Sequence, residues 1–144
     1  MQIFEELIVN ETWKTKELDG DTALSLALEL MQIIGPALAT ASSSFDSNKE
    51  LMEQNLNIPS IVSALMSNFN TGKVTSIIKR LLQNTWKLDV REHGTVEVRA
   101  VDNFSSLFAG KKVITHLPKV LFFVISKNFG NFSNLVDFTS HTQS

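Results

Sequence analysis

The spacing of apolar and polar residues predicts amphipathic helices in the first half of the chain. From Thr22 to Ile34 the polar residues fall within one arc of a helical wheel, and leucines with other apolar residues fill the rest. Gly35-Pro36 is expected to interrupt this helix, because proline has no N–H to donate, although the helix can resume through Ala41 after a kink. Residues 59–68 form a further predicted helix, with Pro59 as its first residue.

The helical pattern is clearest from Thr71 to Asn84. Lysine, arginine, serine and glutamine occupy one side of this segment, and its apolar residues occupy the other: Val74, Ile77, Ile78, Leu81 and Leu82. Three shorter elements are weaker predictions. Residues 40–48 form a serine-rich loop, Asp46 or Ser47 caps a short helix through Glu53, and Phe104 to Ala109 form another short helix. Gly110 is expected to end that last helix in a left-handed conformation.

Between residues 86 and 100 apolar residues no longer follow the helical spacing and instead occupy every second position. Trp86, Leu88 and Val90 alternate with charged residues, His93-Gly94 marks a turn, and alternation then resumes through Val98 to Ala100. This pattern predicts a β-hairpin. A weaker alternation over residues 12–16 indicates an edge strand.

Residues 113–132 are the densest apolar stretch of the chain. The uninterrupted apolar run covers only residues 120–125, which is far shorter than the roughly 20 residues of a membrane span. A core helix is therefore predicted. On a helical wheel Phe122 lies within the broad apolar arc, whereas Phe123 lies on the polar side with Lys119 and Lys127. Phe123 then either packs beneath another segment of the chain, which we favour, or faces a partner.

Composition narrows the classes of function. The chain has 144 residues, 13 of them basic and 15 acidic, and the net charge of −2 argues against nucleic acid as the main partner. Cysteine is absent, which excludes disulfides and thiolate metal sites. The N-terminal residues show no secretory signal pattern. We therefore expect a soluble, intracellular protein with no membrane association.

Motifs for catalysis or cofactor binding are missing. The three histidines are far apart in the sequence and offer no chelating pair, so no metal site is predicted. Thr71-Gly72-Lys73 resembles the end of a phosphate-binding loop, but Ser67 replaces the first glycine and Val74 replaces the magnesium-binding hydroxyl. The carboxylates lie in surface-like segments, without an apolar pocket that would raise a pKa. We predict no catalytic residue and no cofactor.

Phenylalanine is unusually frequent towards the C-terminus. The chain has ten phenylalanines and no tyrosine, and seven of the ten lie at or beyond residue 104: Phe104, Phe108, Phe122, Phe123, Phe129, Phe132 and Phe138. Phenylalanine adds apolar area without a polar group. Most of these residues are explained by a phenylalanine-rich core, and the alternative is a groove or face for an apolar partner segment.

The order of these elements resembles the tail assembly chaperones of long-tailed bacteriophages. The resemblance runs from about Leu18 to Phe132 and includes the string 33–39, the amphipathic helix 74–82, a Phe-x-Gly element at 108–110 and an Asn-Phe-x-x-Phe ending at 128–132. The chain departs from the family pattern in the polar segment 42–49 and beyond Phe132.

The resemblance implies a non-enzymatic chaperone that acts in the cytoplasm of the infected bacterial host. Its partner would be the tape-measure protein, with the tail-tube protein as a further candidate, and polymerisation of the tail tube would displace it. The alternative is a structural adaptor or tail-completion component that is retained in the virion. The sequence leaves the oligomeric state open.

We therefore predict an α+β fold, predominantly α-helical, in which residues 1–132 form a single compact domain with one β-hairpin near 86–100. Residues 133–144 are predicted to be a polar, flexible tail. The helical wheel and the apolar ending together suggest Phe123, Phe129 and Phe132 as the residues that contact the partner.

Overall fold

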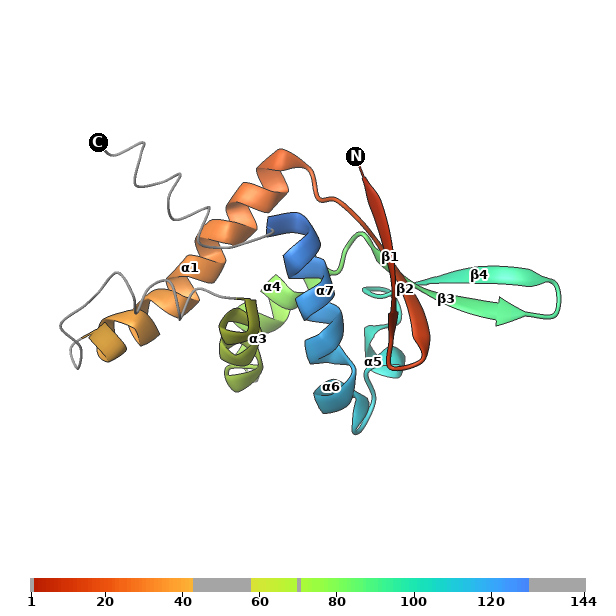
Figure 1. Cartoon of the computed structure of the whole chain (residues 1–144). Helices are drawn as coiled ribbons and strands as arrows, with labels where there is room; N and C mark the ends of the chain where they lie inside the picture. Colours follow the sequence, from red (N-terminus) through yellow and green to blue (C-terminus); the bar gives the residue numbers. More distant parts are fainter. Residues whose placement is uncertain (1, 43–57, 70, 130–144) are drawn as a thin grey trace.

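The fold combines an antiparallel sheet with a group of helices packed against one of its faces (Figure 1). The structure, a computed structural model, describes residues 2–42, 58–69 and 71–129, with side chains for all of these except 34–42. In chain order the elements are β1 (Ile3–Ile8), β2 (Glu11–Lys16), α1 (Gly20–Ser42), α3 (Ile58–Ser67), α4 (Gly72–Leu81), β3 (Thr85–Arg91), β4 (Gly94–Arg99), α5 (Phe104–Leu107), α6 (Lys112–Thr115) and α7 (Leu117–Phe129). The predicted α+β class is confirmed.

The sheet has four strands in the order β1-β2-β3-β4, so the prediction of one hairpin was wrong. The additional hairpin is β1–β2, and β2 lies inside the sheet between β1 and β3, where an edge strand was expected. β1 gave no sequence signal, because Glu5 and Glu6 are adjacent and break the apolar alternation. Its strand conformation depends on pairing with β2, which no local pattern reveals.

The hairpin predicted at 86–100 is confirmed as β3 and β4. Glu92 and His93 form the turn, and Gly94, with φ of 124°, begins β4, so the turn lies one residue earlier than predicted. Figure 1 shows this hairpin projecting away from the helices. Most of β4 is exposed as a result.

Buried residues of β2 and β3 close the inner face of the sheet against the helices. Trp13 of β2 is buried and stacks on Phe108, with ring centroids 5.8 Å apart. Thr15 and Thr85 are opposite each other on β2 and β3, and their hydroxyls are hydrogen-bonded at 2.9 Å. This bond satisfies two buried polar groups, which would otherwise destabilise the fold.

The predicted helices are largely present, with one difference in length. Helix α1 continues to Ser42, so Gly35-Pro36 does not end it, and the helix runs on through Ala41 as the sequence allowed. Residues 40–42 of the predicted loop are helical, and the rest of that loop lies outside the described residues. The alanines and leucine beyond Pro36 favour helix strongly, which offsets the one hydrogen bond that proline cannot make. The predicted helix at 46–53 lies outside the described residues.

Helices α3 and α4 match their predicted positions closely. Thr71 caps α4 by accepting a hydrogen bond at 3.2 Å from the backbone N–H of Val74. Arg80 of α4 pairs with Glu29 of α1 and thereby joins these two helices.

The C-terminal elements lead into α7, which packs against α3, α4, α6, α1 and β1. Gly110 has φ of 60°, which confirms the predicted left-handed residue after α5. At the other end of α7, the side chain of Asn128 accepts a hydrogen bond at 2.8 Å from the backbone N–H of Leu18. This contact ties the end of α7 to the segment that enters α1.

Candidate functional site

Two adjacent phenylalanines of α7 have opposite environments. Phe123 is 1% exposed and belongs to the hydrophobic core, whereas Phe122 is 44% exposed. Phe123 therefore packs beneath other segments of the chain, the alternative that the sequence favoured, and Phe122 faces solvent although the helical wheel placed it in the apolar arc. The wheel fails here because α7 is covered from several directions, so that no single arc corresponds to the core.

The remaining predicted contact residues lie at or beyond the end of α7. Phe129, its last residue, is partly buried and packs against the hydrophobic core. Phe132 lies outside the described residues. Among the other phenylalanines, Phe108 is buried between Trp13 and Phe104, whose ring centroid is 5.2 Å from its own. The phenylalanine-rich C-terminal half therefore serves the core at several positions, and among its described phenylalanines Phe122 is the one on the exposed surface.

Phe122 lies on one wall of a groove between α3 and α7, which we call the α3–α7 groove. Its lining comprises Pro59, Val62, Ser63, Met66, Pro118, Lys119 and Phe122. Five of these seven residues are apolar, and Lys119 is the one charged member. Such a lining suits an apolar partner segment better than a polar small molecule.

A second hollow adjoins the first, because Phe122 and Lys119 line both. We call it the turn hollow; its other residues come from the β1–β2 hairpin and are Glu6, Leu7, Ile8 and Val9. Leu7 and Val9 are 68% and 38% exposed. The two hollows together form a continuous, mainly apolar surface across α3, α7 and the β1–β2 turn.

The backbone of the β1–β2 turn is strained at Val9. Val9 and Asn10 have φ of 48° and 62°, the left-handed values that a two-residue hairpin turn requires. Asparagine adopts this conformation readily, but a β-branched residue such as valine does so at a cost. Leu7 and Val9 were not predicted as site residues, since a strand at residues 3–8 was not expected.

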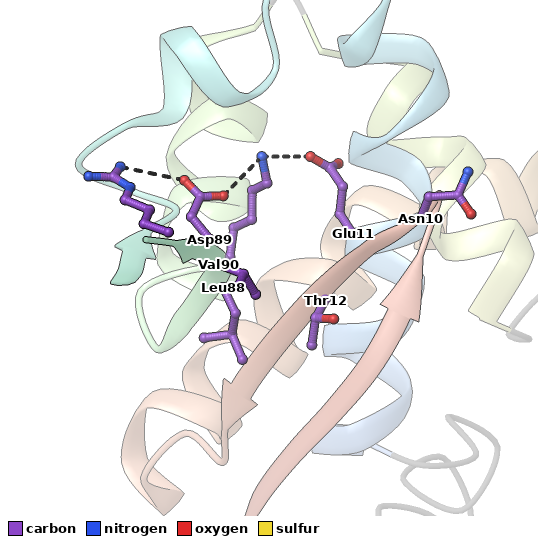
Figure 2. A pocket seen from close by; sticks show the side chains of 8 residues that line it. Asn10, Glu11, Thr12, Leu88, Asp89 and Val90 are labelled. Atoms are coloured by element: carbon purple, nitrogen blue, oxygen red, sulfur yellow. Dashed lines mark ion pairs between the residues drawn. The ribbon is translucent and has the colours of Figure 1, made fainter. Parts of the chain in front are cut away.

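A third hollow lies at the junction of β2 and β3 and is polar. The ammonium of Lys87 pairs with the carboxylates of Glu11 and Asp89, at 2.7 and 3.4 Å. Figure 2 draws ion pairs from Glu11 and Asp89 as dashed lines. Arg91 pairs with Asp89 at 3.7 Å, and His116 lies 3.3 Å from Glu11. The hydrogen bond to Glu11 raises the pKa of Lys87, so this side chain stays charged and does not act as a base. These paired charges join β2 and β3 to His116, the residue between α6 and α7.

The described residues contain neither a cluster suited to a metal ion nor a helix suited to a membrane. No group of three or more histidine, aspartate or glutamate side chains in residues 2–33, 58–69 and 71–129 is placed to hold a metal ion. Within the described part of the chain, no helix has both the length and the apolar character that crossing a membrane requires.

Comparison with known proteins identifies the family. No curated protein and no solved structure matches this chain. Residues 10–137, however, match the family model described as phage tail assembly chaperone protein, TAC. Because this match covers most of the chain, including β2 through α7, the chain belongs to the phage tail assembly chaperone family.

Proposed function

We propose that this protein binds apolar segments of the tape-measure protein and covers them until tail-tube subunits polymerise around that protein and displace the chaperone. Membership of the chaperone family makes it a non-enzymatic protein of phage tail assembly. The observation that supports the proposed binding is the α3–α7 groove with Phe122 exposed at its edge. The proposed place of action is the cytoplasm of the infected host.

The chemistry of the groove suits temporary binding. Apolar contacts are non-directional and tolerate many partner sequences, so one groove can cover successive apolar segments of a long chain. Binding of this kind is reversed by mass action when a competitor occupies the same apolar surface. Tail-tube subunits would be that competitor.

The proposed contact residues begin with Phe122, whose ring is exposed, in place of Phe123, which was selected from the sequence and is buried. Phe129 and Phe132 remain proposed contacts at the end of α7 and beyond it. Phe123 would reach a partner only if α7 left the core, so in this conformation it supports the groove from beneath. A partner segment lying along α7 would meet Phe122 first.

Co-expression with the tape-measure protein of the same phage tests the proposal. We expect the tape-measure protein to be soluble and to co-purify with the chaperone, and to aggregate when it is expressed alone. Phe122→Ser should abolish both effects. Val90→Ser, which alters an exposed apolar residue on the projecting β3–β4 hairpin, is the matched control and should leave both unchanged.

A tape-measure protein that stays insoluble and does not co-purify would overturn the proposal. Mass spectrometry of purified virions then separates the two functions considered from sequence. A chaperone displaced during polymerisation is absent from the mature particle, whereas an adaptor or tail-completion component is present in stoichiometric amounts.

A further inference from the structure

The residues that line the α3–α7 groove are spaced as in a groove that binds a third helix. On α3 the lining residues Pro59, Val62 and Met66 are spaced by three and four positions, and on α7 Pro118 and Phe122 are spaced by four. Each wall is therefore one ridge of a helix, and the two helices pack against each other beneath the groove. A groove between two such ridges accepts the ridge of another helix.

The electrostatic setting of the groove is positive although the chain as a whole is negative. Residues 103–129, which supply the α7 wall, contain four lysines and no acidic residue, whereas the net charge of the chain is −2. Lys119 is exposed at the edge of the groove, and the structure records no ion pair for it among the described residues. The described residues that line the groove include no carboxylate. Glu6 lines the turn hollow, which Lys119 also lines, and the structure records no ion pair between these two residues.

An unpaired cation beside exposed apolar side chains selects a ligand of matching chemistry. The apolar wall binds a stripe of leucine-like side chains, and Lys119 attracts a carboxylate next to that stripe. A lysine in the same place on the ligand would meet like charge from Lys119, which costs binding free energy.

We propose that the α3–α7 groove binds an amphipathic helix whose apolar stripe is bordered by acidic residues, with one of its carboxylates facing Lys119. This inference rests on the proposed function, since it specifies which segments of the tape-measure protein the chaperone covers. The turn hollow, with Leu7 and Val9, extends the apolar contact beyond Phe122.

Two synthetic peptides test the inference with the intact chain. Both are 20-residue amphipathic helices with the same leucine stripe, and glutamates border the stripe in one and lysines in the other. Fluorescence anisotropy at low salt should show the acidic peptide binding about tenfold more tightly. The difference should narrow as salt is added, because exposed charge pairs are screened.

Variants of the chain then assign the effect to residues. Lys119→Glu should reverse the preference between the two peptides, and Phe122→Ser should weaken the binding of both by at least about tenfold. Lys73→Glu makes the same charge change at an exposed lysine of α4 that lines neither hollow, and it should leave the preference unchanged. Circular dichroism confirms that each variant is folded.

The outcomes separate this inference from the proposed function. Equal affinity for the two peptides would overturn the charge selection but not the co-expression result. If neither peptide binds while the tape-measure protein is still made soluble, the groove is not the binding site and this inference is wrong. If neither peptide binds and the tape-measure protein also stays insoluble, the proposed function fails together with the inference.

Discussion

The two faces of α7 differ in what constrains them. On the buried face, Phe123 and its neighbours fill the core between helices and sheet, and nearly all of their surface is removed from water. On the groove face, Phe122 exposes almost half of its surface and Lys119 has no partner among the described residues. The buried face accounts for folding, whereas nothing in the fold requires an aromatic ring at residue 122. This difference is the basis on which we propose Phe122 as a contact residue.

Replacing the buried ring of Phe123 tests whether the buried face of α7 stabilises the fold, and it should have the largest effect on stability. Phe123→Ala removes a fully buried aromatic side chain, and we expect it to lower the free energy of unfolding by about 3–5 kcal/mol. Urea denaturation followed by circular dichroism measures the change. A loss below about 1 kcal/mol would place Phe123 outside the core and restore it as a candidate contact residue.

Replacing the neighbouring ring should give the opposite result. Phe122→Ser is expected to change the free energy of unfolding by about 1 kcal/mol or less, because the side chain is already partly in water. The same variant should weaken partner binding by at least about tenfold in the co-expression and peptide assays. If Phe122→Ser unfolds the protein, the two faces of α7 do not differ in the way described.

The strained β1–β2 turn, which lines the turn hollow next to the groove, allows a test that separates stability from binding. Val9→Asn places at a left-handed position a residue that tolerates it, and we expect the protein to become more stable by about 1 kcal/mol. Affinity for the acidic peptide should fall about two- to threefold, because an apolar part of the turn hollow is lost.

Asn10→Val, the reverse change at the next residue, should destabilise the turn. A stabilised variant with unchanged affinity would exclude Val9 from the binding surface.

A substitution in the polar hollow between β2 and β3 should have the smallest effect on stability and no effect on peptide binding. Lys87→Met removes the ion pairs to Glu11 and Asp89, and it should lower stability by at most about 1 kcal/mol at neutral pH. Because the pKa of Lys87 is raised above 10.5 on folding, the stability it contributes is complete below that pH and is lost as the pH rises through the folded-state pKa. The difference between wild type and variant, followed by urea denaturation, should therefore vanish at high pH. Weaker peptide binding by this variant would extend the site to the polar hollow.

Local patterns predicted the helices and one hairpin well but missed part of the sheet. Helix α4 followed from the spacing of its apolar residues, and Thr71 was identified as its beginning. Strand β1 was missed because Glu5-Glu6 hides its alternation, and α1 runs through Gly35-Pro36, where an interruption before a further helical stretch to Ala41 was expected. In both places contacts or propensities elsewhere outweigh the local signal.

The candidate site was predicted less well than the fold. Among the phenylalanines of α7, the sequence selected Phe123, which is buried, and passed over Phe122, which lines both hollows. The turn hollow could not be predicted at all, because it joins residues 6–9 to residues 119–122 across the whole length of the chain.

The sequence by itself determined the α+β class, the periodicity of its helices, the β3–β4 hairpin and the likeness to the phage tail assembly chaperones. These properties depend on residues that are neighbours along the chain or on their order. Tertiary structure alone decided which aromatic ring of α7 is buried, that β1 completes a four-stranded sheet, and that the β1–β2 turn meets α7 beside Phe122. The physical reason is that burial depends on which distant segments cover a side chain, and a helical wheel contains no information about those segments.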